Sequence, residues 1–126
     1  MGVTLASVKY TIIAMPVERI LFYETGSGRR PVIEALEELE DGEQARVLEA
    51  IEAFTEEFPL VRTVTIRPLV GKLWEMKIGR IRVLYGVVAG VLCVVLLFVK
   101  KSQKTPSGEL ELAVRRLEEM TEELKS

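Results

Sequence analysis

The side chains best suited to chemistry in this chain are the lysines and arginines of one segment. Residues 59–106 hold nine Lys and Arg but one Asp or Glu, whereas residues 1–58 hold five against twelve and residues 107–126 hold three against six. A positive segment between two acidic ones is suited to a polyanionic partner, even though the net charge of the whole chain is −2. We therefore predict an anion-binding surface within residues 59–106.

Two basic residues of this segment are predicted to face each other across a hairpin. Residues Leu73–Ile78 alternate as a strand does, and Gly79-Arg80 suits a two-residue hairpin loop with glycine first. This register places Lys77 opposite Arg82, which costs roughly 0.2–1 kcal/mol relative to a neutral pair. Either a carboxylate, from Glu75 or from the acidic helices, neutralises the two cations, or they bind an anion such as a phosphate. The sequence leaves both interpretations open.

A second basic cluster, Lys100, Lys101 and Lys104, follows the last predicted strand. Thr105 is suited to cap a helix whose first turn contains Pro106, and helix N-termini themselves favour anions. The apolar face of that helix is marked by Leu110, Val114, Leu117 and Met120. In an antiparallel sheet, this second cluster would lie near one end of the first.

The residue types that are missing exclude several classes of site. The chain has no histidine, and Cys93 is its single cysteine. The lack of histidine removes the commonest general base, the commonest metal ligand and any Ser/His or Cys/His nucleophile pair. One cysteine cannot form a disulfide within the chain, and Cys93 lies in an apolar run where a free thiol is a small buried side chain. We therefore expect a reducing compartment, the cytoplasm.

An apolar run, residues 83–99, separates the two basic clusters. Its 17 uncharged residues are marginally long enough for a tilted membrane helix. Valine, a strand-forming residue, dominates the run, and Ala89-Gly90 near its middle suits a tight turn between two strands of ordinary length. A strand that is covered on both faces of the sheet needs no alternation of apolar and polar residues. We therefore expect two central strands of a sheet rather than a membrane span.

The N-terminal half is predicted to contain a strand and a helix hairpin. Residues 18–24 alternate as a strand, and Pro31 suits the first turn of a helix. Asp41 as a cap, with Gln44 three residues on, predicts the start of a second helix that stops at Pro59. The apolar face of the second helix is marked by Val47, Leu48, Ile51, Phe54 and Phe58.

The remaining segments complete the predicted domain organisation. Residues 64–69 have the pattern of a strand. Because proline cannot donate a backbone hydrogen bond, Pro68 predicts that the end of this strand lies at the edge of a sheet or at a bulge. Residues 1–17 are an N-terminal extension with two interpretations left open: either Met15 is the true start of the chain, or the extension is an extra strand or an arm. Residues 18–126 are expected to form a single domain.

Three stretches carry a resemblance to a known family. They read YETGSGRRPVIEALEEL, GKLWEMKIGRIRVLYGVV and LLFVKKSQKTPSGELELAVRRLEEM. The most specific motifs are W-E-x-[KR] to R-x-R-x-x-Y at Trp74–Tyr85, and F-x-K-K-x-Q-K-T-P at Phe98–Pro106 followed by A-x-R-R at Ala113–Arg116. Over residues 18–120 the chain resembles the phage-derived Gp49-like, HigB-type branch of the RelE/ParE toxin superfamily.

The resemblance implies both a fold and a function. The fold is α+β and RelE-like, with an N-terminal strand and a helix hairpin packed on a mostly antiparallel twisted sheet, and a C-terminal helix. The function is that of a type II toxin–antitoxin toxin, an mRNA endoribonuclease that acts at the ribosome. The implied partners are mRNA on the ribosome and a helix-turn-helix antitoxin, with which higher-order complexes form.

The resemblance also implies roles for particular residues, with no metal or other cofactor. The RNA 2′-OH would attack the adjacent phosphate in line and leave a cyclic phosphate. Carried over by position, Arg82 stabilises transition-state charge, Lys77 activates or orients the nucleophile, and Lys101 serves the leaving group or a phosphate. The candidates for contacts with the RNA backbone are Arg67, Lys72, Arg80, Lys100 and Lys104. Many relatives have a histidine in the final strand, at the position of Leu96 in this chain.

Two other functions stay open at this point. One is a non-nucleolytic toxin of the same superfamily, such as a ParE-like gyrase inhibitor. The other is an inactive module that binds an antitoxin and nothing else.

Overall fold

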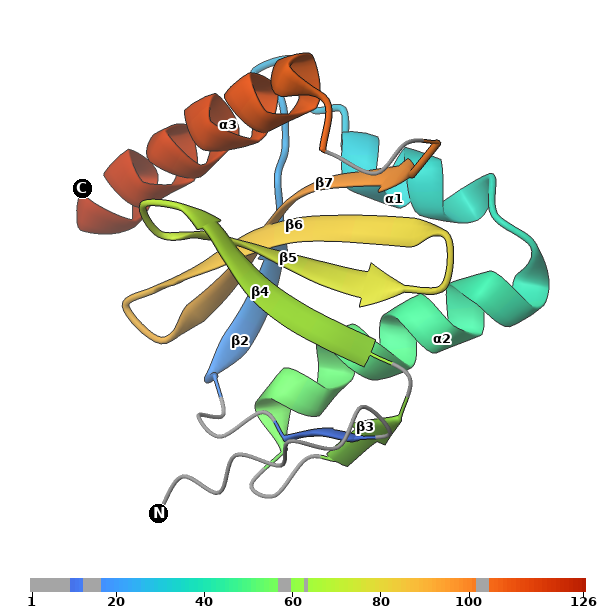
Figure 1. Cartoon of the computed structure of the whole chain (residues 1–126). Helices are drawn as coiled ribbons and strands as arrows, with labels where there is room; N and C mark the ends of the chain where they lie inside the picture. Colours follow the sequence, from blue (N-terminus) through green and yellow to red (C-terminus); the bar gives the residue numbers. More distant parts are fainter. Residues whose placement is uncertain (1–9, 13–16, 57–59, 63, 102–104) are drawn as a thin grey trace.

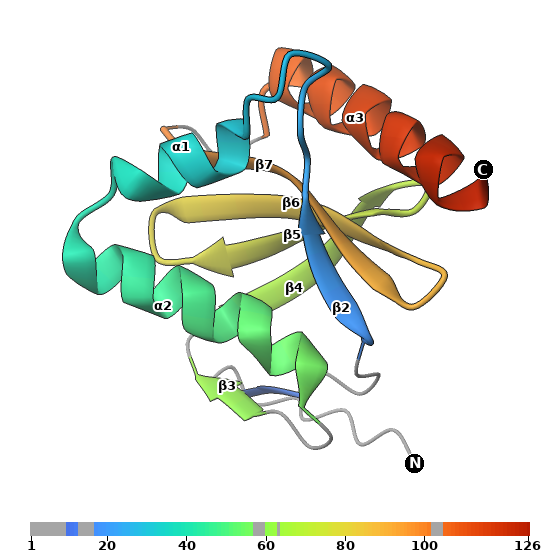
Figure 2. The same cartoon turned by 180° about the vertical axis from the view of Figure 1, so that it is seen from behind.

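The computed structural model describes residues 10–12, 17–56, 60–62, 64–101 and 105–126. A five-stranded sheet lies at the centre, with α1 and α2 on one face and α3 on the other (Figures 1 and 2). The strands are β1 (Tyr10–Ile12), β2 (Arg19–Phe22), β3 (Leu60–Arg62), β4 (Val64–Val70), β5 (Leu73–Ile78), β6 (Ile81–Val88) and β7 (Val91–Val99). The helices are α1 (Pro31–Glu37), α2 (Asp41–Glu52) with the 3-10 turn η1 (Ala53–Thr55), and α3 (Ser107–Lys125). The predicted α+β fold with a C-terminal helix is confirmed.

The sheet order explains why the apolar run shows no alternation. The order is β2-β7-β6-β5-β4, in which β2 is parallel to β7 and the other neighbours are antiparallel. The apolar run supplies β6 and β7, which lie inside the sheet, and all residues of Val91–Leu97 are buried. The prediction of two central strands is therefore confirmed. Among the helices that the structure describes, none is long and apolar enough to cross a membrane.

Both predicted hairpin turns are present. In the β5–β6 hairpin Gly79 has a φ of 60°, and Lys77 lies opposite Arg82 as the spacing predicts. In the β6–β7 hairpin Ala89 and Gly90 have φ values of 51° and 77°, the left-handed pair that a tight hairpin turn of this length requires. The first turn fixes which charged side chains share a face of the sheet.

Two irregularities shape the strands around these hairpins. The edge strand β4 has a register shift between Pro68 and Val70, so the prediction of an edge or a bulge at Pro68 is confirmed. In β7 an extra residue, Val95, lies between two positions that pair with β6. Arg116 Nη1 of α3 donates a hydrogen bond to the Val95 carbonyl oxygen at 3.0 Å. Arg116 therefore anchors α3 to the bulge in β7.

The two faces of the sheet carry separate apolar cores. On the α1/α2 side, Phe54 packs edge-on against Tyr85 with ring centroids 5.1 Å apart, so Tyr85 serves packing as expected. On the α3 side, Cys93 is fully buried, and burial raises the pKa of its thiol to about 11. Gly86 lets α3 approach closely, because a Cβ there would lie 2.7 Å from a Leu117 methyl carbon. The side chains of α3 that are buried on this face are Ala113, Leu117 and Met120.

Two predicted helix caps are wrong. Asp41 is the first residue of α2, and its N-cap is Glu40; the Gln44 side chain donates to the carbonyl oxygens of the preceding loop and not back to the cap. Thr105 does not cap α3, because its hydroxyl donates to the carboxylate of Glu75. The regular α2 helix ends at Glu52, before the predicted stop at Pro59, which is outside the described residues.

The N-terminal extension contributes a strand to the fold. Tyr10–Ile12 form β1, which pairs antiparallel with β3. Within residues 1–17 the structure thus has a strand at these three positions. Met15 lies outside the described residues.

Candidate functional site

Lys77 and Arg82 lie side by side on the face of the sheet that α3 covers. The two-residue turn at Gly79-Arg80 sets their register, and the period of two along β5 puts Glu75 on the same face as Lys77. Phe98 of β7 is the next neighbour of Arg82 across the sheet. The site is therefore built on rigid, paired strands.

Glu75 is the carboxylate at the centre of this site. Its side chain is 0% exposed, and its two oxygens have different partners. Arg67 Nε of β4 donates to Oε1 at 2.8 Å, and Thr105 Oγ1 donates to Oε2 at 2.9 Å. A buried carboxylate requires such partners, because its ionised form is poorly solvated inside a protein. Glu75 thus joins β4, β5 and the segment that leads into α3.

Arg82 makes a different set of contacts. Its Nη1 donates to the carbonyl oxygens of Gly79 at 2.7 Å and Ile81 at 3.0 Å, while its buried Nε has no hydrogen-bond partner within the described residues. In that part of the chain, no ion pair joins Lys77 or Arg82 to a carboxylate. The acidic helices α1 and α2 lie on the opposite face of the sheet; α3 is acidic too and covers this face, but within the described residues no ion pair joins its carboxylates to these two cations. Of the two interpretations left open, the geometry favours the anion site.

Lys100 brings a fourth cation to the group. Its backbone N–H donates to the carbonyl oxygen of Arg80 at 2.8 Å, which fixes the end of β7 beside the β5–β6 turn. Partial burial is the largest cause that lowers the pKa of the Lys100 ammonium. The charges of Arg82, Arg67 and Lys77 lower this pKa further, whereas the charge of Glu75 raises it. We call Arg67, Lys77, Arg82 and Lys100 the basic cluster.

Of the other predicted site residues that the structure describes, none joins this cluster. Arg80 forms a two-point ion pair with Glu43 of α2, at 2.7 Å and 2.9 Å, across the opposite face of the sheet. Its side-chain hydrogen bonds to Glu43 are the largest cause that lowers the pKa of that carboxyl. Lys101 is exposed immediately after Lys100, and Lys104 lies outside the described residues.

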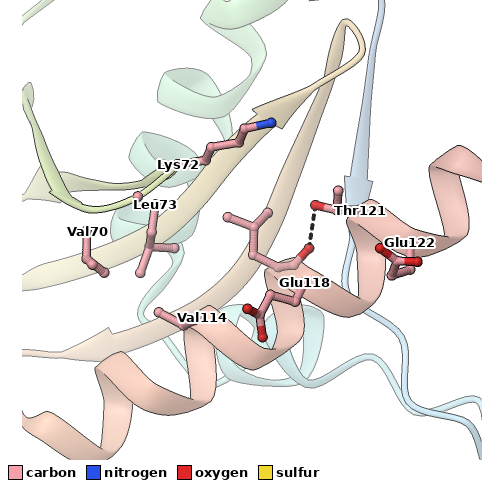
Figure 3. Close-up of a pocket in the computed structure, with 9 residues that line it drawn as sticks. Val70, Lys72, Leu73, Val114, Glu118, Thr121 and Glu122 are labelled. Carbon is pink, nitrogen blue, oxygen red and sulfur yellow. Dashed lines mark hydrogen bonds between the residues drawn. The ribbon is translucent and has the colours of Figure 1, made fainter.

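Lys72 lies at the far end of β5, beside a cavity of about 280 Å³. Figure 3 shows this cavity between the β4–β5 turn and the later half of α3; its labelled lining residues are Val70, Lys72, Leu73, Val114, Glu118, Thr121 and Glu122. Its walls are mainly apolar, and the basic cluster does not line it. Lys72 is therefore separate from the cations near Glu75.

Two features of the site were missed by sequence reasoning. One is the bond between Thr105 and Glu75; a signal for it was present, because Glu75 is the only acidic residue among residues 59–106. The other is that Lys100, and not Lys101, lies beside the strands. Leu96, at the position of the family histidine, is buried on the α3 side and pairs with Leu84, two residue pairs along the sheet from Arg82 and Phe98.

The arrangement can bind a phosphodiester and stabilise added negative charge on it. Arginine offers a planar fork of donors and lysine a compact charge, and both act more strongly where water is partly excluded. Within the described ranges, no three His, Cys, Asp or Glu side chains come together as metal ligands would.

These observations define the class of protein: a RelE-like α+β fold with a basic site on its sheet. The family described as phage-derived protein Gp49-like (DUF891) matches residues 34–118, which is most of the chain. The protein belongs to this family, which is part of the RelE/ParE-like toxin superfamily. Among curated proteins, none matches the chain. Membership of the family is consistent with a toxin of a toxin–antitoxin system and suggests an antitoxin as partner.

Proposed function

We propose that this protein is the toxin of a type II toxin–antitoxin system and cleaves mRNA on the ribosome, as HigB-type relatives are expected to do. The observation that carries the proposal is the basic cluster: four cations on one sheet face with a single buried carboxylate among them. The proposed place of action is the cytoplasm. The proposed inhibitor is a helix-turn-helix antitoxin.

The reaction is a transfer of the phosphoryl group within the RNA. The 2′-oxygen forms a bond to the adjacent phosphorus while the bond from phosphorus to the 5′-oxygen breaks. The 2′-OH loses its proton and the 5′-oxygen gains one, which leaves a 2′,3′-cyclic phosphate and a 5′-hydroxyl. This step needs stabilisation of negative charge, alignment of the reacting atoms and two proton transfers. Lysine and arginine side chains can together supply these contributions.

Roles follow from the position of each cation. Arg82, beside Lys77 and without a carboxylate partner among the described residues, stabilises the charge on the phosphoryl oxygens. Lys77 orients the 2′-OH. Lys100, which is held beside the β5–β6 turn and whose pKa is lowered by partial burial, is the candidate proton acceptor, because a lysine must lose its own proton before it can take another. Lys101, exposed and adjacent, is kept as the candidate on the leaving-group side.

Primer extension on total mRNA after induced expression tests the proposal against its alternatives. We expect growth arrest with new 5′ ends inside translated messages, and relief of both by Arg82→Ala in a protein that stays folded. DNA damage signalling without mRNA cuts would indicate a gyrase inhibitor instead. Normal growth with no cuts would indicate a module that binds an antitoxin only. Each of the last two outcomes overturns the nuclease.

A further inference from the structure

The bulge at Val95 decides which side chains at the end of β7 face α3. Before the bulge the odd-numbered residues of β7 lie on the α3 side of the sheet, and beyond it the even-numbered residues do. The residues on the α3 side are Val91, Cys93, Val95, Leu96 and Phe98. The residues on the α1/α2 side are Leu92, Val94, Leu97 and Val99.

A β7 strand without this bulge would change the basic cluster. Leu97 would replace Phe98 opposite Arg82, because every later residue would shift by one position along β6. Val99 would take the place of Lys100, whose N–H continues the β6–β7 ladder with a hydrogen bond of 2.8 Å. The bulged register is therefore what brings a lysine to this end of the site.

The side chains of β7 do not select the bulged register by themselves. Residues 94–99 read VVLLFV, so either register fills every position on both faces of the sheet with an apolar side chain. The first half of β7 is fixed by the Ala89-Gly90 turn and by the parallel pairing with β2. Within the described residues this pairing with β2 ends at Val94. The second half of β7 therefore needs another contact to hold its register.

Arg116 of α3 makes that contact. Val95 has no partner on β6 and is fully buried, so its carbonyl oxygen needs a donor from elsewhere. Arg116 Nη1 donates to this oxygen at 3.0 Å. The Arg116 guanidinium lies over the Tyr23 ring, with 4.9 Å between Cζ and the ring centroid, and the Tyr23 hydroxyl donates to Glu119 at 2.6 Å. The donor at the bulge is thus itself held in place.

We propose that Arg116 is a positioning residue of the site: by donating to the Val95 carbonyl oxygen it holds the bulge in β7, and so places Lys100 at the basic cluster. The role rests on the proposed nuclease function, whose site it serves. It also gives a purpose to the last arginine of the A-x-R-R motif at Ala113–Arg116, which the reaction itself does not use.

NMR contacts between the α-protons of cross-strand partners report the register directly. Val83 lies opposite Leu97 in the bulged register and would lie opposite Leu96 in the shifted one. Loss of a hydrogen bond from a charged donor moves such an equilibrium roughly tenfold to 100-fold. We expect Arg116→Met to show a second set of signals that joins Val83 to Leu96. The matched change Arg115→Met, at an exposed neighbour on α3, should show the wild-type set alone.

A disulfide between positions 81 and 99 tests the link between the register and the site. Ile81 and Val99 are cross-strand partners on the α1/α2 side, next to the hydrogen bond of the Lys100 N–H. They form a non-hydrogen-bonded pair, whose Cα atoms lie about 4.5 Å apart, within the span of a disulfide. In the shifted register the two positions would not face each other.

Ribosome-dependent cleavage by the full chain is then measured with and without this disulfide. We expect Arg116→Met to lower kcat roughly tenfold with KM unchanged, because fewer molecules hold the bulged register. Oxidised Ile81→Cys/Val99→Cys should restore kcat in the Arg116→Met protein. The same oxidised pair in an otherwise wild-type chain is the control. A shifted register whose cleavage the disulfide does not restore would overturn the positioning role, since Arg116 would then act on the RNA itself.

A role of Arg116 in stability alone would leave the register unchanged. If the folded Arg116→Met protein shows only the contact between Val83 and Leu97, the positioning role is wrong. Where Arg116→Met does not fold, the oxidised triple variant decides. It should regain both the fold and cleavage, and its failure to fold would equally overturn the role.

The register measurement needs no cleavage, so it separates this role from the proposed function. Wild-type protein that cuts no mRNA, with a register that shifts in Arg116→Met, would overturn the nuclease and retain the hold of Arg116 on β7. Wild-type protein that cuts mRNA, with the same register in wild type and Arg116→Met, would overturn the role of Arg116 alone.

Discussion

The sheet face under α3 has two ends of opposite character. At the apolar end, Leu117 and its neighbours on α3 pack over Gly86, Leu84 and Cys93. At the other end, beside the start of α3, the basic cluster surrounds Glu75. Figure 1 shows α3 running between these ends, from the end of β7 toward the β4–β5 turn. One helix thus covers both a core and a site.

The difference between the two ends separates stability from function. Burial of apolar surface contributes about 25 cal/mol per Å², so the apolar end stabilises the fold. Like charges held close together destabilise the fold, and the basic end does not bury a comparable apolar area. Groups that oppose folding are often kept for a functional reason. Substitutions at the two ends should therefore have different consequences.

The largest expected effect is on activity, from Lys100→Met at the basic end. We expect cleavage to fall by about 100-fold or more, which is typical of the loss of a proton-transfer group. Lys100→Arg should not restore it, because a guanidinium stays protonated. The matched change Lys101→Met should have a smaller effect. Full activity in Lys100→Arg would show that Lys100 contributes charge alone.

The next effect is on stability, from Gly86→Ala at the apolar end. The new Cβ would lie 2.7 Å and 2.9 Å from the Leu117 methyl carbons and 3.0 Å from the Lys72 carbonyl oxygen. Overpacking of this kind lowers the free energy of unfolding by about 1–3 kcal/mol. Urea denaturation measures it, with Gly42→Ala as the control, since a Cβ at Gly42 meets nothing within 4 Å. A Gly86→Ala protein as stable as wild type would contradict the close approach of α3.

The smallest effect is expected on the opposite face, from Glu43→Gln. Arg80 lowers the pKa of the Glu43 carboxyl below 4.5, so the ion pair stabilises the protein at neutral pH and loses this contribution as the pH falls through the lowered pKa. Thermal unfolding from about pH 7 to about pH 3 should show a small Tm difference from wild type that disappears in acid. A difference independent of pH would exclude the ion pair as its cause. Cleavage at neutral pH should change little.

Local sequence chemistry predicted much of the fold. The glycine at position 79 and the pair Ala89-Gly90 set two hairpin registers, and Pro68 marked the edge strand, because each depends on backbone geometry alone. Glu75 and Thr105 are 30 residues apart in sequence, and only tertiary packing brings them together. This contact also explains why the cap prediction for Thr105 was wrong: a buried carboxylate competed successfully for its hydroxyl.

The site was predicted less completely than the fold. The opposition of Lys77 and Arg82 followed from the turn, but the sequence could not tell which cations would face α3. Arg80 lies only two residues from Arg82, yet it pairs with Glu43 across the other face. The choice between Lys100 and Lys101 likewise depends on where β7 ends. These details are set by packing of the helices, which local patterns do not encode.

Cleavage of mRNA on purified ribosomes by wild-type protein and Arg82→Ala tests the central claim most directly. Circular dichroism establishes that both proteins are folded. We expect wild-type protein to leave fragments with a 2′,3′-cyclic phosphate end, and Arg82→Ala to produce at least about 100-fold fewer, as the loss of a charge-stabilising donor predicts. Equal cleavage by the two proteins would contradict the account, because the basic end of the sheet would then not carry the reaction.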